Sequence, residues 1–207
     1  MTITLIIVIL TGLVSYQALN DRSMIEKLKH YPYATARNGE YHRLLTGGFV
    51  HGSMTHLLIN MFVLYSFGEY VERAFLIDFG EMQGRLFYLL LYIGAIIVAN
   101  AGTFLRQKDN PGFASVGASG ATSAVMLVFV IYNPWAMLGI FFIIPCPAII
   151  AAVLYLIYSS WASKNSNDMI DHAAHFYGAV FGILFIFISK PSMVNIFLDS
   201  VSHIPYF

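Results

Sequence analysis

Six long runs of apolar residues, separated by shorter polar segments, dominate the chain. A helix of about 20 apolar residues spans the hydrocarbon core of a bilayer, and lipid offers no partner for a free backbone N–H or C=O group. The runs lack the alternation of barrel strands, so each is predicted to be a transmembrane helix. The fourth run is short, which predicts that it begins below the membrane surface. The predicted helices cover residues 2–19, 54–75, 86–105, 118–132, 137–161 and 170–189.

The polar segments between these runs are brief except for residues 20–53. This segment is rich in charged residues and tyrosine, a composition that favours an ordered loop at the membrane interface. The charged run at 20–30 predicts a short surface helix within it. Residues 190–207 are predicted to be a short C-terminal tail without a domain of its own.

The fifth run contains two prolines, Pro145 and Pro147. Proline lacks a backbone N–H and its ring clashes with the preceding helical turn. We therefore expect the predicted helix 137–161 to be kinked at these residues. Cys146 lies between these two prolines. Because it is the single cysteine of the chain, an internal disulfide is impossible, and its predicted role is packing.

Composition indicates a polytopic membrane protein in contact with a lipid bilayer. Of the 207 residues, 58% are hydrophobic and 11% are charged, whereas a soluble domain carries about 25% charged residues. The net charge is zero and there is no run of like charges, so nucleic acid is not an expected partner. The first run follows no basic residue and has no small-residue cleavage site, so we expect a retained helix and not a signal peptide.

Alternating membrane crossings bring particular polar residues together. The second, fourth and sixth predicted helices run in the same direction, so their N-terminal ends lie on one membrane face. His56 and Asn60 lie in the second helix, Ser119 begins the fourth, and His175 lies near the start of the sixth. Polar groups at membrane depth are costly and tend to be functional. The topology therefore predicts that these four residues meet, whichever way the protein is oriented.

These residue types suit acyl transfer, which needs a nucleophile, a base and donors for the oxyanion. Ser119 at a helix N-terminus would bring its own unpaired N–H as one donor. His56 and Asn60 are four residues apart, where both side chains can donate to the same oxygen. His175 is the predicted general base. Ser119 alone could also be a helix cap, and Asn60 alone could bridge two helices.

Small residues predict that the fourth and sixth helices pack closely beside this site. Gly120 and Ala124 begin one residue after the serine, and Gly178 and Gly182 begin three residues after the histidine. This four-residue spacing lets the backbones of membrane helices approach each other.

Three segments carry motifs that are specific in combination: FVHGSMTHLLIN at 49–60, GASG at 117–120 and AHFYG at 174–178. Together they resemble the rhomboid family of intramembrane serine proteases, over about residues 40–185. The resemblance implies an all-α, six-helix rhomboid-like bundle of minimal bacterial type with a long ordered first loop. It also implies a Ser119/His175 dyad that cleaves transmembrane segments of other proteins in a water-filled cavity, with no cofactor. The oxyanion would be bound by His56, Asn60 and the Ser119 amide.

The resemblance also assigns structural roles beside the site. His51 matches a family histidine near the cavity mouth, and Glu72 best matches a structural carboxylate at the far end of the second helix. Gly117, Gly120 and Gly178 are expected to be structural residues around the nucleophile and the base.

The sequence departs from the family pattern in two places. Many members have an aromatic residue four positions after the serine, packed on the histidine, and here that position is Ser123. The Trp-Arg pair found in the first loop of many members is not evident. Asp171, one turn before His175, could orient it as in a triad. Because the family works as a dyad, a solvated carboxylate at the helix start is the preferred interpretation.

Two arguments about membrane orientation disagree. The positive-inside rule would place the helix-start face in the cytoplasm, whereas the resemblance places it outside. Most of the basic residues on that side lie in the first loop, so we follow the resemblance. We expect a multi-pass protein of the bacterial cytoplasmic membrane whose active site faces the extracytoplasmic side. The basic residues on that face are Arg22, Lys27, Lys29, Arg37, Arg43, Arg106, Lys108 and Lys164, against Arg73, Arg85 and Lys190 on the other.

Two other functions are open alternatives. A metal enzyme could use His51, His56, His172 and His175, but the chain has no His-Glu-x-x-His motif, so no metal is predicted. A catalytically silent rhomboid-like protein could instead bind transmembrane clients. Such relatives usually lose the serine or the histidine, and this chain keeps both.

Overall fold

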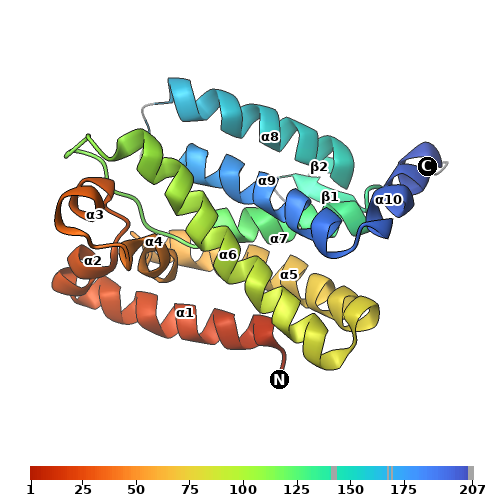
Figure 1. The fold of residues 1–207 in the computed structure, drawn as a ribbon, viewed down its shortest axis with the longest axis horizontal. Coiled ribbons are helices and arrows are strands. Elements are labelled where there is room, and N and C mark those ends of the chain that lie inside the picture. The colour runs from red at the N-terminus through yellow and green to blue at the C-terminus, as the bar shows by residue number, and fades with distance from the viewer. Residues whose placement is uncertain (141–143, 167, 169, 205–207) are drawn as a thin grey trace.

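The computed structural model describes residues 1–140, 144–166, 168 and 170–204, and most of them are helical (Figure 1). Among the described residues, α1, α6 and α9 are long and apolar enough to cross a membrane. The elements in chain order are α1 (Ile3–Asn20), α2 (Arg22–Leu28), α3 (Pro32–Asn38), α4 (Arg43–Thr46), the 3₁₀ turn η1 (Gly47–Phe49), α5 (Met54–Phe79), α6 (Glu81–Gln107), α7 (Ser119–Tyr132), β1 (Met137–Ile140), β2 (Ile144–Pro147), α8 (Ala148–Asn165), α9 (His172–Ser189) and α10 (Ser192–Ser202).

Helix α7 lies in the middle of the bundle, where it contacts α5, α6, α8 and α9. On one side α1 packs against α5, and on the other α8 packs against α9, as Figure 1 shows. Nearly all of α7 after its first residue is buried, as expected for a helix that is apolar on every face. Its N-terminal residue, Ser119, is therefore held among the other helices.

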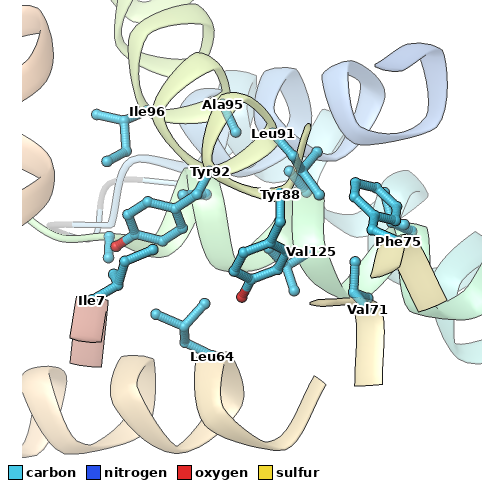
Figure 2. Packing of buried hydrophobic residues seen from close by; sticks show 14 of the residues in the cluster. Ile7, Leu64, Val71, Phe75, Tyr88, Leu91, Tyr92, Ala95, Ile96 and Val125 are labelled. Atoms are coloured by element: carbon cyan, nitrogen blue, oxygen red, sulfur yellow. The ribbon is translucent and has the colours of Figure 1, made fainter. Parts of the chain in front are cut away.

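The core between α1, α5, α6 and α7 is built around two tyrosines of α6. Tyr88 and Tyr92, one turn apart, are fully buried. Figure 2 shows their rings among Ile7, Leu64 and Val125, contributed by α1, α5 and α7. Aromatic rings of this size bury much apolar area at well-defined positions. They fix the spacing of the helices that surround the site.

A buried carboxylate joins α5 to the start of α1. Glu72, only 1% exposed, accepts hydrogen bonds from the amides of Ile3 and Thr4 and from the Thr4 hydroxyl, each at 2.8 Å. The first N–H groups of a helix have no partner within the helix, and its dipole favours negative charge there. The side chain therefore satisfies the N-terminus of α1 inside the bundle.

Replacing Glu72 with alanine is expected to lower the free energy of unfolding by about 3 kcal/mol, because it leaves buried donors of α1 unpaired. Glu72→Gln keeps one acceptor oxygen and should lose less. Thermal unfolding in detergent measures both effects. The matched control is Glu81→Gln on the exposed start of α6, where the partner is Arg85 at 3.1 Å; equal melting temperatures for Glu72→Ala and this control would contradict the capping role.

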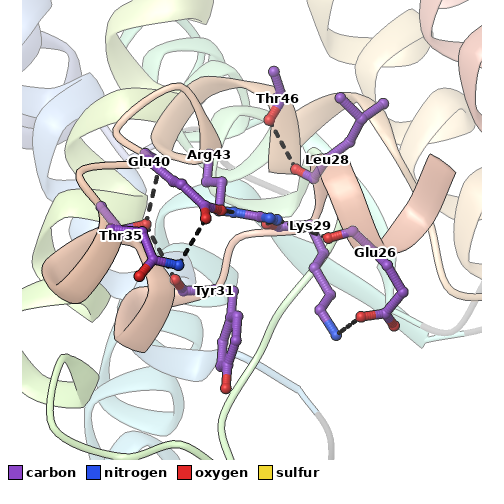
Figure 3. Close-up of polar contacts among 9 residues, drawn as sticks. Glu26, Leu28, Lys29, Tyr31, Thr35, Glu40, Arg43 and Thr46 are labelled. Carbon is purple, nitrogen blue, oxygen red and sulfur yellow. Dashed lines mark hydrogen bonds and ion pairs between the residues drawn. The ribbon is translucent and has the colours of Figure 1, made fainter. Parts of the chain in front are cut away.

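The segment between α1 and α5 folds around a buried arginine (Figure 3). The guanidinium of Arg43 donates to the carbonyl oxygens of Glu26 at 2.8 Å and Lys29 at 3.0 Å, and to the Glu40 carboxylate. Thr46 donates to the carbonyl of Leu28 at 2.8 Å. These contacts tie α2 to α4 across the segment. The predicted surface helix at 20–30 corresponds to α2, whose N-cap is Asp21.

The prediction of one helix over 137–161 is wrong in its first part. Residues 137–140 and 144–147 form the antiparallel pair β1 and β2, with Met137 opposite Pro147, and α8 begins at Ala148. Proline cannot donate a helical hydrogen bond and disfavours helical backbone in the residue before it. Pro147 therefore precedes the helix in extended backbone, with ψ 135°, instead of kinking it. Part of the predicted run, residues 141–143, lies outside the described residues.

Other helix boundaries differ by smaller amounts. Helices α5 and α6 run beyond the predicted 54–75 and 86–105 and are joined by Gly80 alone, at φ 79°. The pattern of apolar residues did not predict these extra turns, because they contain charged residues, among them Asp78, Glu81 and Arg85. The predicted tail contains α10, which touches α9.

Candidate active site

Ser119 is the first residue of α7, preceded by Ala118 at the N-cap. Its side chain is partly exposed, whereas Ala118 and Gly120 on either side are buried. Its carbonyl oxygen accepts hydrogen bonds from Thr122 at 3.0 Å and Ser123 at 2.7 Å. The amide of Ser119 is one of the first-turn donors that the helix itself cannot pair. A reachable hydroxyl and a free amide thus lie together at the start of α7.

His51 holds the backbone that leads into Ser119. Its ring is fully buried, and Nε2 accepts from the amide of Ala118 at 3.3 Å. Ser15 of α1 donates its hydroxyl proton to the carbonyl of Phe49, so its oxygen accepts from His51 Nδ1 at 2.8 Å. These bonds fix the neutral tautomer with the proton on Nδ1. The ring bridges α1 to the residue before Ser119.

His56, in the first turn of α5, lies against the glycine two residues before Ser119. Its ring meets that of His51 edge to face, with centroids 4.9 Å apart. A methyl group added at Gly117 would lie 2.7 Å from His56 Cε1, and Gly117 has φ 121°, a backbone conformation that favours glycine. His56 is partly exposed, so its ring is placed beside the Ser119 turn and stays reachable.

Changing Gly117 to alanine is expected to lower activity roughly 100-fold, since the new methyl group must displace His56 or the Ser119 turn. Gly39→Ala is the matched control: Gly39 also has positive φ, 72°, but an added methyl group there meets nothing within 4 Å. Both substitutions strain the backbone, but only the alanine at position 117 also clashes with the His56 ring. Comparable cleavage rates for the two purified proteins would contradict the contact with His56.

Asn60 is buried and joins α5 to α7. Its amide nitrogen donates to the carbonyl of His56 at 3.0 Å, and its carbonyl oxygen lies 3.3 Å from the Thr122 hydroxyl, whose single proton also faces the Ser119 carbonyl at 3.0 Å. An amide NH₂ has two protons, so one remains after the bond to His56. Thr122 lies one turn after Ser119, which places Asn60 beside the start of α7.

Helices α7 and α9 meet backbone to backbone beside Ser119 and His175. A methyl group added at Gly178 would lie 2.1 Å from the carbonyl oxygen of Gly120, and one added at Gly120 would lie 3.2 Å from the carbonyl oxygen of Ala174. Further along, Gly182 faces Ala124 in the same way. Ser119 is the neighbour of Gly120 in α7, and His175 is the neighbour of Ala174 in α9. Ser119 and His175 therefore lie on adjoining turns of the two helices.

Within the described residues, Ser119 and the His175 ring form no hydrogen bond. Catalytic hydrogen bonds are often long in proteins without substrate and shorten when it binds. The His175 ring instead stacks on Tyr155 of α8, with centroids 6.3 Å apart and planes 21° apart.

Asp171 is the N-cap of α9 and is turned toward α6 and the segment before Ser119. It accepts from the amide of Ala174 at 2.9 Å, from Thr103 at 2.9 Å and from Ser115 at 3.0 Å. Burial raises the pKa of its carboxyl above the usual range. It is a helix-start carboxylate, as predicted, but a partly buried and bonded one, and its side chain has no bond to the His175 ring.

Ser115 links this carboxylate to the first loop. His30 and Ser115 exchange backbone hydrogen bonds at 3.0 and 2.9 Å, and their side chains meet at 3.2 Å. Burial lowers the pKa of His30 to about 4, so it is neutral at neutral pH. The amide of Gly117 donates to Gly47 at 2.9 Å. The segment before Ser119 is thus held by the first loop.

Four of the seven histidines form two separate ring pairs, His51 with His56 and His172 with His175. His172 meets His175 edge to face at 5.8 Å, and its Nε2 lies 3.1 Å from Asp168. Across the described parts of the chain, no three His, Cys, Asp or Glu side chains are arranged to hold one metal ion.

Among the contacts that sequence reasoning missed are those made by Ser15, Thr122 and Tyr155. None belongs to a motif, and each is brought in by helix packing. Only Thr122, one turn after Ser119, had a spacing that could have indicated it.

Known proteins resemble most of this chain. Residues 38–192 match the model of the Rhomboid domain family. RHOMBOID-like protein 12, mitochondrial, of Arabidopsis thaliana is 33% identical over 153 residues, which cover 69% of this chain and 45% of that protein. "Putative rhomboid protease YdcA" of Bacillus subtilis is 29% identical over 153 residues, with coverage of 73% and 68%. Presenilin-associated rhomboid-like protein, mitochondrial, of Homo sapiens is 28% identical over 152 residues, with coverage of 69% and 36%. The matches thus span less than half of the first and third relatives.

Proposed function

The chain belongs to the rhomboid family, and from this membership and the geometry around Ser119 we propose that it is an intramembrane serine endopeptidase. It hydrolyses peptide bonds in or near transmembrane segments of other membrane proteins. The observation that carries the proposal is the backbone contact of Gly120 with Gly178, which sets Ser119 and His175 on adjoining turns.

The bundle is proposed to cross the bilayer six times. Helices α1, α6 and α9 have the length and hydropathy of membrane spans, and the family places the chain in a membrane. We add α5, α7 and α8, which pack between or beside these three. Helix α7 has only 14 residues, so Ser119 lies below the surface, where water must be admitted for hydrolysis.

The proposed reaction uses Ser119 as nucleophile and His175 as general base. The Ser119 oxygen attacks the substrate carbonyl carbon and its proton passes to the His175 imidazole. The oxyanion accepts hydrogen bonds from the Ser119 amide, from His56 and from the second N–H of Asn60. The peptide C–N bond then breaks, and His175 gives the proton to the leaving amine. Water cleaves the acyl-enzyme by the same steps, and Ser119 recovers its proton.

Neighbouring residues are proposed to hold this machinery in place. His51 fixes the backbone before Ser119 through the Ala118 amide, and Gly117 leaves room for the His56 ring. Gly120 and Gly178 allow the close approach of α7 and α9. A transmembrane helix must unwind before its carbonyl reaches Ser119, so we expect substrates with small or helix-breaking residues near the membrane surface.

The test of the function is co-expression of the full chain with a tagged model transmembrane substrate. We expect a cleavage product from the wild-type chain, and none from Ser119→Ala or His175→Ala at equal protein levels. Product from either variant would overturn the dyad. Product that disappears with chelator and not with a fluorophosphonate would favour a metal enzyme instead.

We further propose that the active site faces the extracytoplasmic side of the bacterial cytoplasmic membrane. In an Arg37→Cys variant the new thiol lies in α3, at a side chain 59% exposed, while native Cys146 is buried. A membrane-impermeant maleimide should label it in intact cells. Glu81→Cys, 80% exposed at the opposite end, should react only after lysis; the reverse pattern would invert the orientation.

A further inference from the structure

The ring of His175 is stacked on one aromatic ring, which belongs to α8. Tyr155 stacks on it at 6.3 Å with the planes 21° apart. Its other ring neighbour, His172, meets it edge to face at 5.8 Å and 82°. Among the described residues no side chain forms a hydrogen bond with the His175 ring. The stacked tyrosine is therefore the contact that most directly sets the plane of the imidazole.

Tyr155 is itself anchored to the residue that bears the nucleophile. Its hydroxyl lies 2.5 Å from Ser123 Oγ. Ser123 donates its only hydroxyl proton to the carbonyl oxygen of Ser119 at 2.7 Å, so the tyrosine is the donor in the first bond. A chain of two hydrogen bonds thus runs from Tyr155 to Ser123 to the backbone of Ser119.

Ser123 makes this arrangement possible through its size and its hydroxyl. It is 4% exposed on α7, one turn after Ser119, on the side that receives Tyr155. An aromatic residue at position 123 would clash with Tyr155, whose hydroxyl lies 2.5 Å from Ser123 Oγ, and an alanine would remove the acceptor of that hydroxyl. The pair of Ser123 and Tyr155 therefore does together what one aromatic side chain on α7 could do alone.

We propose that Tyr155 is the positioning residue for the general base His175, and that Ser123 is its anchor. The inference rests on the proposed function, because it concerns the base of that reaction. A general base works only when it is oriented toward the proton that it takes. Since Tyr155 belongs to α8, the orientation of His175 depends on α8 being packed against α7 and α9.

The experiment compares kcat and KM of the purified full chain on a fluorogenic model transmembrane substrate. Tyr155→Leu removes the ring and should lower kcat roughly 10- to 100-fold with KM nearly unchanged. Tyr155→Phe keeps the ring and should recover most of the activity, with a loss of about 3-fold for the missing hydrogen bond. Trp161→Leu, which removes an exposed aromatic on the same helix, is the matched control and should retain wild-type kcat.

A double-mutant cycle tests the anchor. Ser123→Ala and Tyr155→Phe remove the same hydrogen bond, so the double variant should be no slower than the slower single variant. Independent, multiplying losses would overturn the proposed link between them.

The outcomes separate this inference from the function itself. If Ser119→Ala and His175→Ala abolish cleavage but Tyr155→Leu behaves like Trp161→Leu, the positioning role is wrong and the protease remains. An equal rise in KM and fall in kcat for Tyr155→Leu, unrescued by phenylalanine, would mean a structural role only. Cleavage that persists in Ser119→Ala would overturn the function and this inference together.

Discussion

Replacing Ser119 with alanine is expected to abolish peptide-bond cleavage while the transmembrane substrate stays bound. Removal of the nucleophile alone costs a serine protease roughly a million-fold in kcat, which is as much as removal of its whole catalytic set. In the proposed function the surrounding helices hold the substrate, and binding does not need the hydroxyl. The expected result is therefore a complex that can be isolated by co-purification with a tagged substrate, without product.

Ser66→Ala is the control for this variant, because Ser66 is an exposed serine of α5 away from the start of α7. It should cleave like the wild-type chain. The comparison also separates the protease from a silent relative that binds transmembrane clients. If a cellular effect of the protein is unchanged by Ser119→Ala, client binding and not proteolysis is its function.

Replacing Gly178 with alanine is expected to lower both stability and activity. The added methyl group would lie 2.1 Å from the Gly120 carbonyl oxygen, and a backbone atom cannot move aside as a flexible side chain can. Helices α7 and α9 must therefore separate. Overpacking of this kind costs about 1–3 kcal/mol or more, and a shift of about 1 Å between Ser119 and His175 costs roughly 100-fold in rate.

Gly12→Ala is the matched control, since a methyl group added at Gly12 in α1 meets nothing within 4 Å. Alanine in an open helical position should raise stability by about 0.5–1 kcal/mol. Thermal unfolding and cleavage rates of the two variants measure the difference. Wild-type behaviour of Gly178→Ala would contradict the close approach of the two helices.

Much of the site could be predicted because its parts lie at helix starts. The predicted alternation of membrane crossings places the starts of α5, α7 and α9 on one face without any knowledge of packing. The spacing of Gly120 with Ala124 and of Gly178 with Gly182 indicated which two helices approach, and the structure brings these residues into backbone contact. Patterns of this kind are local in sequence, so an apolar period and a few small residues are enough to reveal them.

Other features depend on contacts that no local pattern encodes. The strand pair of residues 137–140 and 144–147 is as apolar as a helix, and only the placement of Pro145 and Pro147 distinguishes the two. The stack of Tyr155 on His175 joins residues of different helices. The role of Ser15 requires α1 to lie beside the loop that contains His51. Each of these follows from tertiary packing, which the sequence pattern leaves open.

The charge pattern carries little weight against the proposed orientation, for a related reason. Arg43 is buried and bonded to backbone carbonyls, and Arg37 pairs with Asp109 at 3.3 Å. The positions of basic residues that hold a folded segment together are determined by the contacts of that segment. They carry less information about the side of the membrane than residues in short, solvated linkers.

The most direct measurement of the central claim is the site and rate of reaction with a fluorophosphonate, followed by peptide mapping. We predict one adduct, on Ser119, in the full-length wild-type protein. The reaction should slow at least about 100-fold in His175→Ala, because the hydroxyl loses its base. An adduct on a different serine, or an unchanged labelling rate in His175→Ala, would contradict a Ser119/His175 dyad.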